Sequence, residues 1–231
     1  MSLPAPRRRA AGGEPLRRAV LIWLVLHALI FSADLLAPHP PEFQDRQAAG
    51  VAPSLAPSES GLLHPLGTDR FGRDVLSRVL HGARLSVLAG LAAAALAVAL
   101  GTVLGVLAGY AGGRVDGLVM RLCELTASLP WLYLLLGIRA LLPLETPPEK
   151  TLFYLAGLIG LLAWPQPARL VRGVAAAARR ADFVTAARGF GAPHRHLIRR
   201  HLLPQVAGTA LTQLTLLVPA CVLAEVVLSF F

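Results

Sequence analysis

The chain alternates between long apolar runs and shorter polar segments that are rich in arginine. Five of the apolar runs reach the length of about 20 residues that an α-helix needs to cross the hydrocarbon core of a bilayer. They cover residues 19–37, 85–111, 118–142, 152–171 and 206–231. This pattern predicts an all-α fold: a polytopic membrane helical bundle with five spans.

The polar segment 172–205, ahead of the last apolar run, predicts two helices joined by a turn that contains glycine. Residues 175–188 lack proline and glycine and consist mainly of alanine and arginine, which favour helix. Residues 194–203 form the second helix, and Pro204 then opens the last span, because proline suits the first turn of a helix. Since small side chains let another surface approach closely, we expect this segment to contact a partner protein.

Charge and hydropathy together favour a membrane protein. The chain is 55% hydrophobic with a mean hydropathy of +0.60, yet its net charge is +9. Basic cytosolic loops between apolar spans produce this combination, and the positive-inside rule places such loops in the cytosol. Asp182 is the only acid between residues 169 and 200. We therefore expect segment 172–205 and the N-terminus to be cytosolic. The arginines of this region are Arg169, Arg172, Arg179, Arg180, Arg188, Arg195, Arg199 and Arg200.

The sequence offers no nucleotide-binding motif. Lys150 is the only lysine, and the Gly-Lys-Ser/Thr of a phosphate-binding loop cannot be written around it. An ATPase that works with this protein must therefore be a different chain. Cys123 and Cys221 both lie inside apolar runs and are interpreted as small packing residues. We expect no catalytic residue, no metal ligand and no cofactor.

The region between the first two apolar runs predicts a linker and a short helix. Residues 38–66 are rich in proline, serine and glutamate, which is typical of an extracytoplasmic linker. Asp74 is a natural N-cap for a surface helix over 75–81, and Arg78 is its i, i+4 partner. We expect Gly82 to let this helix turn into the next span.

Two segments of the chain resemble the permease subunits of ABC transporters. Thr185-Ala186-Ala187, followed by Gly191 and then by Leu203-Pro204, is similar to the EAA loop of that family, although Thr185 stands where glutamate is usual. The other segment resembles a motif of the dipeptide, oligopeptide and nickel branch, and we call it the outer motif. Its residues are Gly67, Thr68, Asp69, Gly72, Arg73, Asp74, Ser77, Arg78, Gly82, Arg84 and Ser86.

The resemblance implies a permease subunit of an ATP-driven importer for peptides or related small solutes. In that family the EAA loop forms a coupling helix that docks into a groove on a cytosolic ATPase subunit. The implied partners are those ATPase subunits, a second permease subunit in a heterodimer, an extracytoplasmic solute-binding protein and the lipid bilayer, without nucleic acid. The implied location is a cytoplasmic membrane of bacterial type. The implied coupling residues are Asp182, Thr185, Ala186, Ala187, Gly191, His201 and Pro204.

Composition, the apolar pattern and the resemblance together divide the chain into parts. A disordered cytosolic tail (1–18) precedes a first transmembrane helix (19–37), an extracytoplasmic linker with its surface helix (38–83) and a permease core (84–231) that contains the coupling loop (172–205). Members of this branch have a sixth span after a Ser-Phe-Leu-Gly-Leu-Gly segment, which would begin where this chain ends. A truncated product and a subunit that works without its last helix both fit this pattern.

Polar residues of the last span are candidates for a solute pathway. Thr209, Thr212 and Gln213 share one helix face at i, i+3 and i+4, and a polar face in lipid must meet protein or water. Glu225 is the only acid of this run, and a functional role and simple wetting near the outer end are equally compatible with its position. Pro130 should kink the third span and is a candidate hinge.

Three glycines repeat every four residues in the second span, at positions 101, 105 and 109. They lie on one helix face, where another helix backbone can approach closely. Close packing inside one subunit and an interface between subunits explain this pattern equally well.

Two other function classes were considered. An intramembrane enzyme would use Asp34, Glu225 or the histidines 194, 196 and 201, but the sequence contains no HExxH or GxSxG motif. A scaffold or nucleic-acid-binding loop would need aromatic residues to stack on bases, and segment 172–205 offers only Phe183 and Phe190. The permease hypothesis accounts for both recognisable segments.

Overall fold

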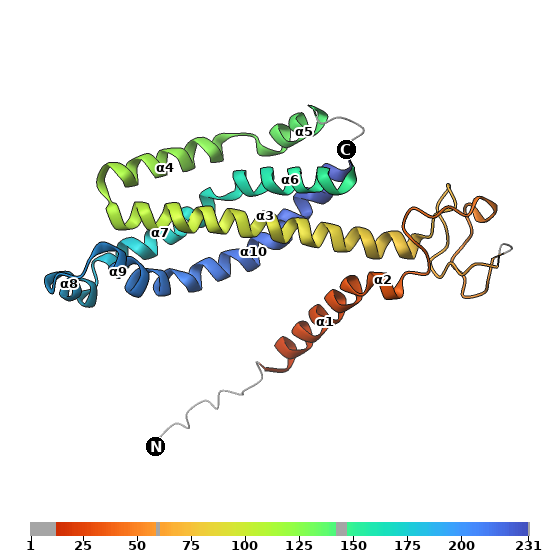
Figure 1. Ribbon diagram of the computed structural model, residues 1–231, viewed down its shortest axis with the longest axis horizontal. Coiled ribbons are helices and arrows are strands. Elements are labelled where there is room, and N and C mark those ends of the chain that lie inside the picture. Colours follow the sequence, from red (N-terminus) through yellow and green to blue (C-terminus); the bar gives the residue numbers. More distant parts are fainter. Residues whose placement is uncertain (1–12, 59–60, 142–146, 231) are drawn as a thin grey trace, which may run out of the picture. The chain divides into compact units, whose positions relative to one another are not determined.

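The computed structural model describes residues 13–58, 61–141 and 147–230, and within these ranges the regular structure is helical (Figure 1). The chain divides into two compact units, residues 1–84 and 85–231. Residues 1–12 of the predicted cytosolic tail and residues 142–146, at the end of the predicted span 118–142 and just after it, lie outside the described residues. The helical architecture confirms the expected all-α membrane bundle.

The first unit contains two helices and a folded loop. Helix α1 (Gly13–Phe31) is followed by the single turn α2 (Ala33–Leu36) and, further on, by a 3₁₀ turn over Arg46–Ala48. The loop has no extended strand among its described residues, but two isolated antiparallel bridges hold it together, Gln44 to Arg73 and Thr68 to Asp74. The segment therefore has a fixed backbone path where only a linker was expected.

Helix α3 (Val75–Ala111) begins in the first unit and continues into the second without a break. The expected turn at Gly82 is therefore wrong. A helical glycine costs only about 1 kcal/mol relative to alanine, and it ends a helix only where the flanking sequence also favours a turn. The residues after Gly82 are strong helix formers, so the helix continues.

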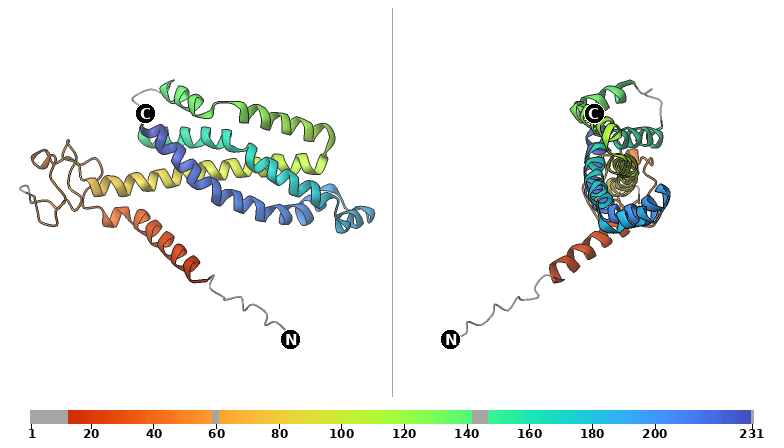
Figure 2. Two further views of the ribbon diagram at one scale, coloured as in Figure 1. Left: turned by 180° about the vertical axis from the view of Figure 1, so that it is seen from behind. Right: turned by 90° about the vertical axis from the view of Figure 1, so that its left-hand side faces the viewer.

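In the second unit, helices α6 and α10 pack along α3 (Figures 1 and 2). Buried alanines of α3, among them Ala93 and Ala97, form a core with Leu155 and Ile159 of α6 and with Leu228 of α10. The helices of this unit are α4 (Gly113–Ser128), α5 (Trp131–Leu141), α6 (Pro148–Ala163), α7 (Pro165–Arg179), α8 (Asp182–Gly189), α9 (His194–Leu197) and α10 (Leu203–Phe230).

The glycine face of α3 packs against α7 of the same chain. A Cβ placed on Gly101 would lie 2.9 Å from the Ala168 backbone nitrogen, and one on Gly105 would lie 2.6 Å from the Ala168 carbonyl oxygen. A Cβ on Gly109 would lie 2.6 Å from the Arg172 carbonyl oxygen. The structure thus assigns these three glycines to packing within the subunit.

Prolines interrupt two of the predicted spans. Pro130 separates α4 from α5, and the two helices meet at an angle of 72°. Trp164 separates α6 from α7, with Pro165 in the first turn of α7. Because proline lacks an N–H and its ring clashes with the preceding turn, a straight helix cannot pass these positions.

By length and composition, two helical stretches of the described residues can cross a membrane, Val75–Ala111 and His194–Phe230. The bent pair α4 and α5 adds a third if it is counted as one span. The remaining two of the five predicted spans fall in α1, whose first turns carry Glu14, Arg17 and Arg18, and in the 16 residues of α6. The charged residues shorten the apolar stretch of α1, and the break before Pro165 shortens that of α6.

Candidate functional site

Loop 172–205 folds as a helical hairpin, but its first half differs from the expected single helix over 175–188. Helix α7 ends at Arg179, and Ala181 adopts extended backbone with ψ 145° before α8 begins at Asp182. This break redirects α8 so that Val184 becomes fully buried. Burial of an apolar residue in the core outweighs the high helix propensity of the surrounding alanines.

The second half of the loop also differs from expectation. Helix α9 (His194–Leu197) does not end ahead of Pro204 but passes through a π-helical turn, Ile198–Leu202, directly into α10. The ring of Pro204 would clash with the carbonyl of Arg200 in a regular α-helix, and the wider π turn relieves that clash. The last span and the loop are therefore joined by continuous helix.

The base of the hairpin is a small apolar core. Val184 of α8, Leu197 of α9 and Leu202 of the π turn are all fully buried. They pack with Val171 and Ala175 of α7 and with α3 through Val106. Apolar side chains of α3 and α7 thus hold the base of the hairpin in place.

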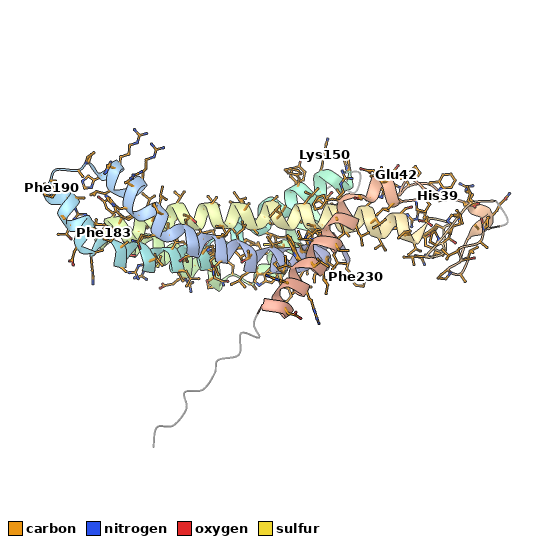
Figure 3. The ribbon with its side chains drawn as sticks, turned by 90° about the horizontal axis from the view of Figure 1, so that it is seen from below. His39, Glu42, Lys150, Phe183, Phe190 and Phe230 are labelled. Atoms are coloured by element: carbon orange, nitrogen blue, oxygen red, sulfur yellow. The ribbon has the colours of Figure 1, made fainter. Side chains whose placement is uncertain are left out.

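The opposite surface of the hairpin is exposed. Thr185 and Ala186 are solvent-accessible on α8, and Gly191 follows with a φ of +80° that favours glycine. Phe190 is 92% exposed and lies with Phe183 at the tip of the hairpin (Figure 3). From the sequence, Phe183 and Phe190 are candidates only for stacking on bases, and the apolar tip that they form was not predicted.

The seven candidate coupling residues do not share one face. Asp182 is exposed like Ala186, whereas Ala187 is half-buried against the apolar base. His201 is also half-buried, with its ring centroid 5.7 Å from those of Phe183 and His196. Pro204 is exposed in the first turn of α10. The structure therefore exposes some of the candidate coupling residues and partly buries others in the base of the hairpin.

Three polar contacts tie the hairpin to the turn between α3 and α4. Arg172 donates two hydrogen bonds to the carboxylate of Asp116, from Nε at 2.8 Å and from Nη2 at 2.5 Å. Tyr110 Oη lies 2.5 Å from His194 Nδ1, and Arg179 donates to the Ala111 carbonyl oxygen at 3.1 Å. A cation and an acid 56 residues apart carry no local sequence signal, so the Arg172–Asp116 pair was not expected.

In the first unit, Asp69 organises the outer motif. Its carboxylate accepts hydrogen bonds from the backbone N–H groups of Phe71 (2.8 Å) and Arg73 (3.0 Å). It also accepts from Arg73 Nε at 2.9 Å and from Arg78 Nη1 at 2.6 Å. Desolvation opposes its ionisation, but these hydrogen bonds outweigh that effect and lower the pKa of Asp69 to about 2.

Asp74 caps helix α3, as expected, but it does not pair with Arg78. Its Oδ2 accepts from the backbone N–H and the hydroxyl of Ser77, both at 2.7 Å, and its Oδ1 lies 3.0 Å from His64 Nδ1. Asp74 is buried, whereas Arg78 reaches Asp69 instead. Burial raises the pKa of Asp74, but the hydrogen bonds from Ser77 and His64 lower it by more.

Two glycines of the outer motif, Gly67 and Gly72, allow close approach of another backbone segment. Gly67 and Gly72 have φ values of +76° and +74°. A side chain on Gly72 would collide with the backbone of Asp45, and one on Gly67 with the backbone of Val51. Thr68 contacts the same segment, because its hydroxyl oxygen accepts a hydrogen bond from the backbone N–H of Val51 at 3.0 Å. These positions therefore serve the fold of the loop.

Arg84, the last charged residue of the outer motif, pairs with Asp34. The distance from Arg84 Nη1 to Asp34 Oδ2 is 2.7 Å, and His81 Nε2 lies 3.3 Å from Asp34 Oδ1. Asp34 was named from the sequence in the enzyme alternative, but this ion pair was not predicted. Gly82 lies between the two basic residues and has open space where a side chain would be.

The pathway candidates are dispersed. Gln213 and Glu225 are buried in α10, and Ser229 Oγ donates to Glu225 at 2.5 Å, whereas Thr212 is exposed. Two cavities of about 530 and 210 Å³ lie beside the α4–α5 break, and they share Ala127, Leu162, Ala163 and Leu217 in their linings. None of the four polar candidates of α10 is among the described residues that line these two cavities.

Comparison with known proteins identifies the kind of bundle. Residues 101–231 match the family described as binding-protein-dependent transport system inner membrane component. The oligopeptide transport system permease protein OppC of Escherichia coli (strain K12) is 40% identical over 214 residues, 92% of this chain and 68% of that protein. The chain belongs to this permease family.

Two further relatives agree with this assignment. The dipeptide transport system permease protein DppC of Bacillus subtilis (strain 168) is 35% identical to the chain and covers 91% of it. The probable D,D-dipeptide transport system permease protein DdpC of Escherichia coli (strain K12) is 37% identical and covers 94% of it. The matched region of the chain spans 61% to 69% of the length of these three permeases. The family resemblance and the transport class expected from the sequence are confirmed, and the enzyme and scaffold alternatives have no support.

Proposed function

We propose that this permease is one half of the membrane channel of an ATP-driven importer for peptides or related small solutes. The permeases most similar to it that are described above are named for oligopeptide or dipeptide transport. In this proposal a second permease subunit completes the channel as a heterodimer, and an extracytoplasmic protein delivers the solute. The N-terminus and loop 172–205 are cytosolic, in agreement with the eight arginines between residues 169 and 200.

Loop 172–205 is the contact to separate ATPase subunits. The observation that carries this proposal is the two-sided hairpin: Val184 and Leu197 are fully buried, while Ala186 and Phe190 on its other side are exposed. An apolar tip next to small side chains fits a groove on another protein, and its buried base transmits a push on the tip to α3 and α10. The chain itself carries no phosphate-binding loop, so hydrolysis belongs to the partner.

The test replaces Ala186 with arginine, because a long charged side chain should hold the hairpin away from the partner. We expect Ala186→Arg to insert normally but to lower solute-stimulated ATP hydrolysis of the assembled transporter by about tenfold or more, as for other disrupted contact centres. Ala177→Arg is the matched control, since Ala177 is an exposed alanine on α7 in the same loop.

Membrane levels, hydrolysis and transport are measured together for both variants. Normal hydrolysis and transport in Ala186→Arg would refute the contact assignment. Equal losses in both variants would show only that added charge in the loop is harmful, which also counts against a specific face.

A further inference from the structure

A polar cavity of about 570 Å³ lies between loop 172–205 and the turn that joins α3 to α4. Its walls come from the turn between α3 and α4, from the end of α7 and from α8. Elements that are distant in sequence therefore line one open, polar cavity. The charged and hydroxyl side chains that line it are Asp116, Arg172, Arg179, Arg180, Thr185 and Arg188.

The charges of this cavity do not balance. Among the described residues, Arg172 is the cavity arginine with an acidic partner, and Asp116 neutralises it in a two-point ion pair. Arg179 donates to a neutral carbonyl, and Arg188 lies 5.9 Å from the ring centroid of Tyr110. Within the part of the chain that the structure describes, no carboxylate pairs with Arg179, Arg180 or Arg188. Three positive charges thus face one space without an anion.

Thr185 adds no negative charge to this cavity. It lines the cavity from α8 as a neutral hydroxyl side chain. A hydroxyl can donate a hydrogen bond to an oxygen ligand, but it contributes no negative charge. The cavity therefore keeps a hydrogen-bond donor next to its arginines and lacks the carboxylate that would otherwise neutralise them.

We propose that this cavity binds a phosphate group through Arg179, Arg180 and Arg188, with Thr185 as an additional donor. Guanidinium groups match phosphate oxygens in two-point hydrogen bonds and stay charged at every physiological pH. Both a phospholipid headgroup and free phosphate carry this chemistry. The neighbouring apolar side chains Val115 and Leu118 of α4 are 45% and 63% exposed, which suits the acyl chains of a lipid.

The bound phosphate joins two parts of the permease that otherwise meet through few polar contacts. Arg179 and Arg180 end α7, whereas Arg188 belongs to α8 of the hairpin. A ligand shared between them fixes the angle between α7 and α8. The lining of this site shares no residue with the two cavities beside the α4–α5 break.

The test uses the full chain, purified in neutral detergent, and counts bound lipids by native mass spectrometry. We expect retention of dioleoylphosphatidylglycerol over dioleoylphosphatidylcholine. Arg180→Gln with Arg188→Gln should weaken phosphatidylglycerol binding by about tenfold or more, because charge-assisted hydrogen bonds are lost. The control changes Arg195 and Arg199 to glutamine, which removes the same charge from another basic surface of the loop, and should stay within about twofold.

A second variant, Thr185→Glu, places a carboxylate among the arginines and should displace the lipid while leaving the unliganded melting temperature unchanged or higher. Inorganic phosphate, tested by its effect on the melting temperature, separates the two sources. Stabilisation by phosphate that Arg180→Gln with Arg188→Gln abolishes assigns the site to free phosphate, and binding of phosphatidylglycerol alone assigns it to lipid. Equal losses in the control variant, or no binding of either ligand, would overturn the proposal.

Discussion

Asp69 and Asp74 act on the backbone around them, and each does so through a different set of donors. The Asp69 carboxylate accepts hydrogen bonds from two backbone N–H groups and from two arginine side chains. The Asp74 carboxylate is buried and is hydrogen-bonded to Ser77 and His64. Carboxylates with this many donors stabilise one loop conformation only while they are ionised. The folded loop of the first unit therefore depends on pH through these two residues.

Acid should loosen the outer motif. Asp69 has a pKa of about 2 in the fold, below the ordinary value of about 3.9 in an unfolded chain. Its contribution to stability is therefore complete above about pH 4 and is lost as the pH falls towards 2. The protection factors of residues 61–84 in hydrogen–deuterium exchange, which correct for the pH dependence of intrinsic exchange, should fall over this interval. In Asp69→Asn the exchange should already be fast at pH 5, whereas Glu42→Gln, a change at an exposed acid of the same unit, should behave like the parent chain.

Two apolar residues of loop 172–205 should respond oppositely to truncation. Leu197 is fully buried, and Leu197→Ala should lower the free energy of unfolding by about 2 to 5 kcal/mol through lost burial and a cavity. Phe190 is 92% exposed, so Phe190→Ala should change it by less than about 0.5 kcal/mol. Chemical denaturation in mixed micelles measures both. A large loss of stability in Phe190→Ala would mean that the tip is packed and not free for a partner.

At the scale of the helices, local sequence patterns predicted where glycine and proline allow or prevent close packing. The break at Pro130 and the glycine face of α3 could be inferred from residue type and spacing. The turn expected at Gly82 was wrong because the strong helix formers that follow outweigh one glycine. The break at Ala181 could not be inferred locally, since burial of Val184 redirects α8.

The contact between α3 and α7 should not tolerate a methyl group. A Cβ on Gly105 would lie 2.6 Å from the Ala168 carbonyl oxygen and 3.0 Å from the Arg172 nitrogen, so two backbones must separate. Gly105→Ala should therefore destabilise the chain by about 1 to 3 kcal/mol. Gly157→Ala in α6 is the control, because nothing lies within 4 Å of its Cβ, and it should gain up to about 1 kcal/mol from helix propensity. Thermal unfolding in one detergent compares them, and similar shifts for both would contradict the packing assignment.

Across the whole chain, the apolar runs revealed a membrane bundle, and the two motifs revealed its family. The polar contacts of the candidate site were less predictable, since their partners are far apart in sequence. Arg84 meets Asp34, and Arg172 meets Asp116, in pairs separated by 50 and 56 residues. No local pattern assigns an arginine to one acid among several. The supports of a site are therefore harder to infer from sequence than its exposed residues.

The Arg172–Asp116 pair should transmit motion between loop 172–205 and the rest of the permease. Its two hydrogen bonds hold α7 to the start of α4, next to the close backbone contact at Gly109. The side chains are 40% and 21% exposed, so solvent screening limits their coupling energy to about 1 kcal/mol. The effect of a change should therefore be larger on coupling than on stability.

Charge reversal tests this role. Asp116→Arg alone places two cations together, and Arg172→Asp alone places two acids together, so each should raise the ATP hydrolysed per solute transported by the assembled complex. The exchanged pair, with both substitutions, should recover part of the parental ratio because opposite charges face each other again. Membrane levels and melting temperatures of the three variants identify losses that come from misfolding. If the exchanged pair is no better coupled than the single variants while all three remain folded, the ion pair does not link the loop to α4.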